Sequence, residues 1–252
     1  MTDRIKKASC FFNAGVLLLT MLVFNSTVTT AQCPDKKLLW NRIINLRDSI
    51  KPPLPDQLKE LFPYVDKLKQ CPDPEDSTLA LLYQRIGAFH FLPGDFDGGI
   101  RYTKLSMKVI YDHLSSPSVN PAHLIKSYNN LRICYDSLGQ KELRNASIDS
   151  SISLMVRLKT GYEYGIPLLY IRTRDFFEIG DYYKCIDYCN LGERVTREAG
   201  YGTADIFQYI IWRLNALQYL QQYSQLEVQL ISAISEAEDK KAESYLELQQ
   251  QS

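Results

Sequence analysis

The sequence predicts an all-α protein in which paired helices repeat along the chain and stack into a right-handed solenoid. Apolar residues recur at helical spacing in long segments, and no strand-like alternation is bounded by turn residues. Single glycines end these segments regularly, at Gly94, Gly139 and Gly180, and Gln221 holds the same place in a fourth segment. This regular interval, a little over forty positions each time, is typical of stacked helical hairpins.

Residues 1–31 have the three-part layout of a secretory signal peptide. Three basic residues precede an apolar run from Phe11 to Phe24, and a short polar region leads to Ala31. This run is shorter than the roughly 20 residues that cross a bilayer as a helix. We therefore expect cleavage near Ala31 and an exported protein, periplasmic or extracellular, of the bacterial envelope. The alternative is membrane anchoring by an uncleaved signal.

Charge excludes two classes of partner. Removing residues 1–31 takes three basic residues and one acidic residue from the 29 of each kind, which leaves 26 and 28 and a net charge of about −2. Both signs are mixed along the chain, whereas nucleic-acid and membrane-surface binding need clustered Lys and Arg. We therefore expect no nucleic-acid partner. The sequence has no second long hydrophobic segment, so we also expect no membrane span in the mature chain.

Residues 32–75 are expected to form an N-terminal helical hairpin. Its predicted arms, 36–50 and 56–70, flank a proline-rich turn. If the arms are antiparallel and of equal length, Cys33 and Cys71 both fall at the open end and are placed to form a disulfide. That bridge would stabilise the hairpin by roughly 3 to 4 kcal/mol in the chain-entropy model. The alternative is two unpaired thiols in a reducing compartment.

Residues 78–238 hold about four repeat units, of which the first is the clearest. It carries an aromatic residue, a Leu-Gly-like pair, a second aromatic residue, and a Gly-Asp-aromatic corner followed by a small residue. These positions are Tyr83, Ile86, Gly87, Phe89, Gly94, Asp95, Phe96 and Gly99. The corner recurs as Gly180-Asp181-Tyr182 in the third unit and as Gln221-Gln222 in the fourth, and the second unit is expected to carry two extra residues before Ala146.

This pattern resembles the tetratricopeptide repeat (TPR) family, in units longer than its usual ones. Together with the export signal it is similar to the N-terminal regions of bacterial TPR sensor histidine kinases and of CHAT-domain proteins. The resemblance implies a non-enzymatic scaffold that binds proteins or peptides. The alternative is a truncated extracytoplasmic sensor region of a larger signalling protein, because residues 239–252 read as an incomplete extra helix without a partner.

No group of residues suggests catalysis, a metal site or a cofactor. His90 occupies a packing position, and a dyad of Cys134 with His90 has no nucleophile motif behind it. Cys185 and Cys189 share a helical face but lack further metal ligands, so buried thiols are expected. We therefore expect no enzyme and no bound cofactor.

The resemblance implies that exposed positions on the first helix of each unit line a concave groove that takes a protein or peptide of unknown identity. The candidate groove residues are Gln84, Phe91, Lys126, Asn129, Tyr170, Arg174, Phe177 and Asn215, and the same face also includes Ala88, Ile133, Asp136, Ile211 and Gln218. Tyr170 and Phe177, seven apart on one face, are the best candidates for a contact.

Overall fold

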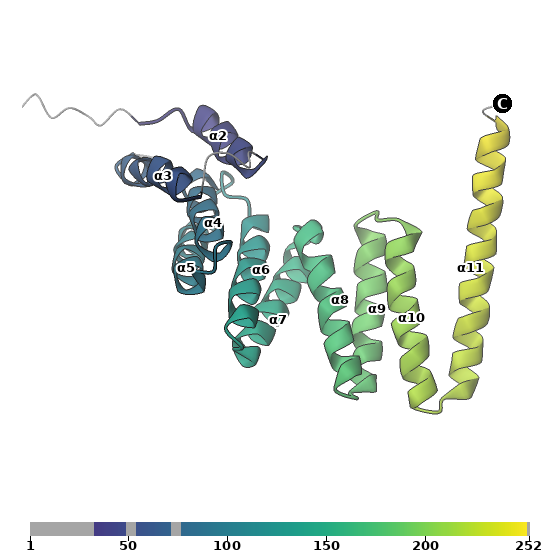
Figure 1. Ribbon diagram of the computed structural model, residues 1–252. Helices are drawn as coiled ribbons and strands as arrows, with labels where there is room; N and C mark the ends of the chain where they lie inside the picture. The colour runs from purple at the N-terminus through teal and green to yellow at the C-terminus, as the bar shows by residue number, and fades with distance from the viewer. Residues whose placement is uncertain (1–32, 49–53, 72–76, 251–252) are drawn as a thin grey trace, which may run out of the picture.

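The computed structural model describes residues 33–48, 54–71 and 77–250, and this part of the chain is folded into ten α-helices and contains no strand (Figure 1). The helices are α2 (Lys36–Asp48), α3 (Leu54–Lys69), α4 (Ser77–Phe91), α5 (Phe96–Asp112), α6 (Ala122–Ser137), α7 (Lys141–Leu158), α8 (Tyr162–Glu178), α9 (Tyr182–Glu198), α10 (Thr203–Tyr219) and α11 (Tyr223–Gln250). The predicted all-α fold class is confirmed, and the predicted signal peptide lies outside the described residues.

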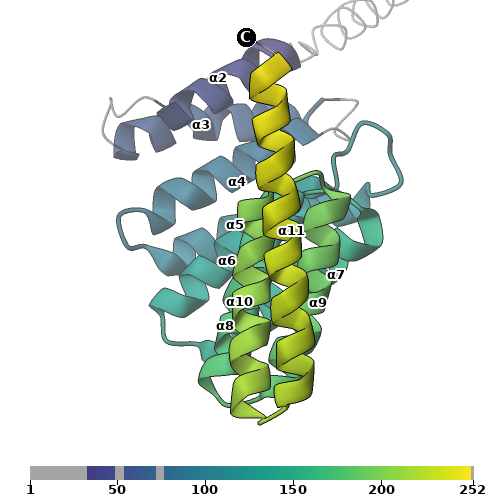
Figure 2. The same cartoon turned by 90° about the vertical axis from the view of Figure 1, so that its right-hand side faces the viewer.

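Four helical hairpins stand side by side, α4 with α5, α6 with α7, α8 with α9 and α10 with α11 (Figures 1 and 2). The first helices of neighbouring hairpins contact one another, α4 with α6, α6 with α8 and α8 with α10. Comparable contacts do not join the second helices of the described units. The first helices therefore form the inner surface of the array and the second helices the outer surface. None of the described helices has the length and apolar character of a bilayer-crossing segment.

The four corners within the hairpins share one backbone geometry. Gly94, Gly139, Gly180 and Gln221 all have positive φ, and in each case the next helix begins two residues later. The residue after each of them donates its N–H to the carbonyl oxygen five residues earlier, for example Asp95 to His90 and Asp181 to Phe176. These hydrogen bonds satisfy a carbonyl group at the end of the first helix of the hairpin. The expected two extra residues before Ala146 are therefore absent, and α7 starts in register with α5 and α9.

Gln221 is the corner residue that lacks the freedom of glycine, because its φ is 56°. A left-handed conformation is strained for a residue with a side chain, and glycine removes this strain although it adds entropy to the unfolded chain. We expect Gln221→Gly to raise the free energy of unfolding by about 0.5–1 kcal/mol, measured by urea denaturation. Gln222→Gly, one residue on, is the matched control and should lower it. Equal losses in both variants would show that Gln221 is not strained.

The last helix differs from expectation. α11 runs from Tyr223 to Gln250 without a break, so the residues from 239 onward continue this helix and do not form a separate one. The cause is local, because neither glycine nor proline interrupts the sequence of this segment. α11 thus extends well beyond α10, its neighbour in the hairpin (Figure 1).

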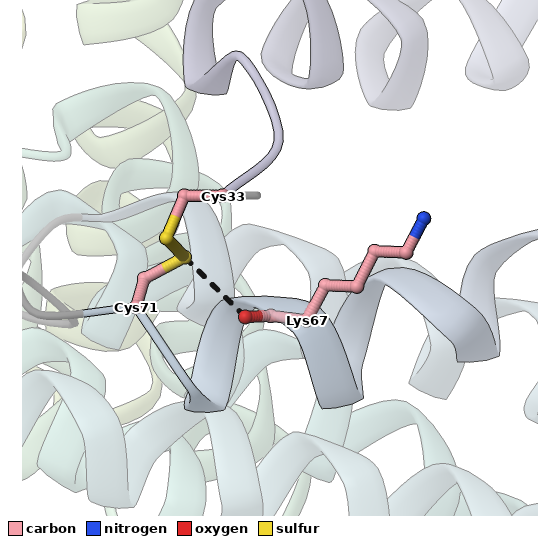
Figure 3. The surroundings of a disulfide bond; sticks show 3 residues. All are labelled: Cys33, Lys67 and Cys71. Atoms are coloured by element: carbon pink, nitrogen blue, oxygen red, sulfur yellow. Dashed lines mark hydrogen bonds between the residues drawn. A yellow bond between two sulfur atoms is a disulfide. The ribbon is translucent and has the colours of Figure 1, made fainter. Parts of the chain in front are cut away.

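The N-terminal hairpin of α2 and α3 is closed by the predicted disulfide between Cys33 and Cys71, whose Cα atoms are 5.6 Å apart (Figure 3). The Cys71 sulfur also lies 3.3 Å from the carbonyl oxygen of Lys67. Ile43 of α2, Leu61 of α3 and Leu82 of α4 belong to one buried apolar cluster. The hairpin therefore covers the first end of the solenoid, where α4 would otherwise expose its apolar side.

A buried histidine lies where the hairpin meets the solenoid. Trp40 of α2 packs edge-on against the ring of His123 in α6, with ring centres 5.8 Å apart, and neither ring nitrogen has a hydrogen-bond partner among the described residues. Burial, with a smaller contribution from the charge of Lys126, lowers the pKa of His123 from its usual 6.5 to about 4. The folded chain therefore holds this ring neutral over the range in which the unfolded chain protonates it.

This difference predicts a pH dependence of stability. Below pH 6.5 His123 is protonated in the unfolded state but stays neutral in the native state. The free energy of unfolding therefore falls as the pH falls, and it levels off near pH 4, where the native His123 is protonated as well. Between pH 7 and pH 5 we expect His123 alone to remove about 2 kcal/mol from the free energy of unfolding. Denaturant titrations of His123→Phe should show a correspondingly shallower loss. Equal slopes for wild type and His123→Phe would contradict the assignment.

Candidate binding surface

One predicted groove residue is not on any accessible surface. Gln84 is only 2% exposed, and its Nε2 donates to the carbonyl oxygen of His123 at 2.6 Å and to the hydroxyl of Ser127 at 2.7 Å. The assignment of Gln84 to the groove was therefore wrong. The reason is that α4 is surrounded by α2, α3, α5 and α6, so the hairpin seals the inner side of the first unit.

Three further candidates, on the inner helices of the first two units, are half-buried and already engaged with other side chains. Phe91 packs at the first corner, with its Cβ 2.9 Å from where a Cβ on Gly99 would be. The ammonium of Lys126 lies 5.6 Å above the ring of Tyr164, and the Asn129 side-chain oxygen accepts from Arg132 at 3.1 Å. These residues are spread along α4 and α6 and do not converge on one site.

The remaining candidates lie on the inner helices of the third and fourth units, where aromatic side chains gather. Phe177 of α8 packs against Trp212 of α10, with ring centres 4.9 Å apart, and against Tyr219 of α10 at 5.5 Å. Tyr170 reaches Trp212 at 6.3 Å, and Tyr182 stacks on Tyr219 at 5.0 Å with ring planes 16° apart. We call Tyr170, Phe177, Tyr182, Trp212 and Tyr219 the aromatic surface.

The aromatic surface is partly open. Tyr219 is 63% exposed and Ile211 53% exposed, and Asn215 stands between them on the same face of α10, one turn from each. Arg174 lies one turn from Tyr170 on α8 and pairs with Glu178 at 3.4 Å, which balances the charge beside the rings. The result is an apolar surface with polar groups at its edge, formed by the inner helices α8 and α10 together with Tyr182 at the start of α9.

Trp212 and Tyr219 were not among the sequence-based candidates, although a signal for them exists. One repeat period after Tyr170 and Phe177 stand Ile211 and Gln218, which the alignment of the units selected. The aromatic residues stand one position further along α10 and are turned toward α8. Tyr170 and Trp212, like Phe177 and Tyr219, are separated in the sequence by one position more than the repeat period. This shared spacing of aromatic residues is the signal in the sequence that could have indicated the contact.

The thiols and imidazoles are arranged for packing. Burial raises the pKa of the Cys134 thiol to about 11, so this sulfur is protonated at neutral pH and is a poor nucleophile. His90 Nδ1 is paired with the capping carboxylate of Asp95 at 2.7 Å. Cys185 and Cys189 are fully buried, and the hydrogen bond between them, together with burial, raises the pKa of Cys189. The described residues contain no group of three or more His, Cys, Asp or Glu side chains that could hold a metal ion.

The known proteins that resemble this chain resemble it in fold. No protein-family model matches the sequence, and no curated protein matches it. Among solved structures, BtubC (BKLC) from P. vanneervenii superposes with a TM-score of 0.52 at 13% identity, over 72% of this chain and 72% of that one. This likeness shows the fold alone, an all-α array of helical hairpins.

Two structures described as TPR-like repeats of a Podosopora anserina putative kinesin light chain are also similar, each with a TM-score of 0.47 and 9% identity. They cover 79% of this chain, and 91% and 92% of their own chains. Within this chain itself, the regular corners and the inner row of first helices are the features of a solenoid.

Proposed function

We propose that this chain is an exported, non-enzymatic scaffold that binds a protein partner through a peptide segment, extended or helical, on the aromatic surface. One observation carries the proposal: the aromatic surface continues from α8 to α10 on the inner side of the solenoid, where its member Tyr219 and the neighbouring Ile211 are both exposed. TPR-like folds commonly mediate protein–protein contacts, and aromatic side chains are the usual anchors of such contacts.

The chemistry of the surface suggests what it binds. The ring faces and edges of Phe177, Trp212 and Tyr219 suit an apolar or aromatic side chain. Contacts between rings in preferred orientations stabilise a complex beyond the burial of apolar area alone. The amide of Asn215 can bond to a peptide main chain that runs along α10. The nearby Arg174–Glu178 pair is neutral as a whole, so the proposed anchor is an uncharged residue.

Trp212 provides a direct test. The chain has two tryptophans, and Trp40 lies in the hairpin, so a Trp40→Phe variant has Trp212 as its sole tryptophan. Peptides selected from a random phage-displayed library against the folded chain should then shift or quench the Trp212 emission saturably. Selected peptides that bind without changing this emission would place the binding surface elsewhere.

Export is proposed from two features. Residues 1–31 read as a signal peptide, and the Cys33–Cys71 bridge is of a kind that persists in oxidising compartments. Expression of the full chain in a bacterial host should give a periplasmic product whose mass lacks residues 1–31. A full-length cytoplasmic product with reduced Cys33 and Cys71 would contradict export.

A sensor role within a larger signalling protein is a second candidate, and α11 favours it. Val228, Leu230, Ile231 and Ile234 are all exposed on this helix, which offers an apolar face to a further helical element. A sensor should transmit ligand binding to that helix. Saturation with a selected peptide is then expected to slow amide hydrogen exchange in α11 as well as in α8 and α10. Unchanged exchange in α11 would favour the simple scaffold.

A further inference from the structure

The last helix, α11, carries an apolar row on a side that does not face α10. Ile231 and Ile234 are each more than half exposed, and Leu230 beside them is nearly half exposed. Leu226 and Ala233, two turns apart, are half-buried, as expected of the side that packs on α10. The helix therefore has two apolar sides, and its own hairpin uses one of them.

No helix in the described part of the chain covers the second side. α10 is the main neighbour of α11, and the ion pair of Arg197 with Glu236, at 2.9 Å, ties α11 to α9 on the same side as α10. α11 stands at the end of the array, and its second half extends past α10 (Figures 1 and 2). The opposite end of the array differs, because α2 and α3 share a buried apolar cluster with α4. Exposed apolar rows of this kind mark interaction sites.

The exposed row is the first part of a longer pattern in the sequence of α11. From Ile231 onward, positions that share one side of the helix follow one another at alternating spacings of three and four residues. These positions, which we call the α11 seam, are Ile231, Ile234, Glu238, Lys241, Tyr245 and Leu248. Such spacing is typical of the contact seam between two helices of a coiled coil. The seam therefore matches a second helix.

The charges in the seam favour a second copy of α11 in antiparallel orientation. With a twofold axis between Asp239 and Lys240, Glu238 of each copy lies opposite Lys241 of the other copy. A parallel pair would instead place Glu238 against Glu238 and Lys241 against Lys241, and like charges repel. Polar residues within a seam fix register and orientation at a cost in stability. The order of these two charges therefore selects the antiparallel pair.

The same register also matches the apolar positions. It places Ile234 of one copy opposite Tyr245 of the other, and Ile231 opposite Leu248. Each apolar position of the seam thus meets an apolar or aromatic position, and the charged pairs lie at the centre between them. Burial of the exposed Ile231 and Ile234 would supply the main stabilisation.

We propose that two copies of this chain associate through the α11 seam as an antiparallel, twofold-symmetric pair. In such a pair the same surface of both copies forms the interface. The seam shares no residue with the aromatic surface, so the inference does not depend on the proposed function. The dimer carries two aromatic surfaces, one from each copy.

Sedimentation velocity of the purified folded chain over a wide range of concentrations tests the association. We expect a reversible dimer whose Kd rises at least about tenfold in Ile231→Ser/Ile234→Ser, because these side chains lose their burial. Both residues are exposed in the single chain, so the variant should keep its fold, which circular dichroism checks. Val228→Ser, an exposed apolar position about a quarter turn from the seam, is the matched control and should leave the Kd unchanged. A wild-type chain that stays monomeric, or equal losses in both variants, would overturn the proposal.

Charge reversal tests the antiparallel register. Glu238→Lys and Lys241→Glu should each raise the Kd of the dimer by about tenfold, because each places like charges opposite one another. The double variant Glu238→Lys/Lys241→Glu should return to the wild-type Kd. Single variants that associate like wild type, or a double variant that stays weak, would contradict the register.

A distance between two spin labels gives an independent measurement of orientation. Labels at an exposed position near the start of α11, in Ser224→Cys, should lie about 45 Å apart in the antiparallel dimer, from the 1.5 Å rise per residue. In a parallel pair they would lie within about 20 Å of one another, because paired helices are only about 8–10 Å apart. The short distance would therefore overturn the antiparallel assignment.

Discussion

Replacing Gly192 with alanine is expected to lower the free energy of unfolding by about 2–4 kcal/mol. Gly192 lies on α9 where the ring of Tyr209 from α10 crosses it, and a Cβ would lie 2.3 to 2.6 Å from three ring atoms. Tyr209 is only 1% exposed and donates its hydroxyl to the Ile166 carbonyl at 3.1 Å, so the ring cannot move without breaking this bond. The loss should exceed the gain of about 1 kcal/mol that alanine brings to a helix.

A second substitution distinguishes this steric cause from a general loss of stability. Tyr209→Leu removes the ring, and in that background Gly192→Ala should become neutral or stabilising, because only its helix propensity remains. Urea denaturation of the four chains in this double-mutant cycle measures the coupling. Additive losses in the free energy of unfolding would show that the close approach of Gly192 and Tyr209 is not the cause of the destabilisation.

Opening the disulfide by the double change Cys33→Ser and Cys71→Ser should destabilise the N-terminal hairpin by about 4 kcal/mol, given its sequence separation of 38. Trp40 on α2 reports on the hairpin, so in a Trp212→Phe background its fluorescence should show an unfolding transition at a much lower urea concentration. Because units of a solenoid interact mainly with their neighbours, amide exchange in α8 to α10 should stay close to wild type.

Reduction supplies the control for that prediction. A thiol reductant should shift the Trp40 transition of the bridged chain to that of the double serine variant and leave the variant unchanged. The buried Cys134, Cys185 and Cys189 have no bridge to lose, so they contribute nothing to the shift. An unchanged Trp40 transition after reduction would mean that apolar packing of the hairpin on α4, rather than the bridge, holds it in place.

Features set by neighbouring residues could be predicted from the sequence. The corners follow from a residue with positive φ and, in the first and third units, an aspartate that accepts from the N–H three residues on, Asp95 from Gly98 at 2.9 Å and Asp181 from Lys184 at 3.2 Å. The disulfide follows from the hairpin between Cys33 and Cys71. Each of these depends on short-range geometry that periodicity and turn chemistry specify.

Features that depend on distant packing were missed. Gln84 is buried because the N-terminal hairpin of α2 and α3 packs on α4. The sequence around Gln84 contains no pattern that predicts this contact. Trp212 and Tyr219 contact α8 because α10 is rotated by one position relative to the repeat alignment. In the second unit, Ala146 matches the small residue of the repeat pattern only if two extra residues precede it. The structure has no extra residues there, and Arg144 holds that packing position.

The central claim is that the inner aromatic surface binds a peptide. It is tested most directly by the Kd of library-selected peptides for Ile211→Ser/Tyr219→Ser, compared with wild type and with Tyr183→Ser. Tyr183 is 65% exposed on the outer helix α9, which matches the 63% of Tyr219 on the inner helix α10. We predict a rise in Kd of at least about tenfold for the inner variant and no change for the outer one. Equal affinities of all three chains, or a loss confined to Tyr183→Ser, would contradict the claim.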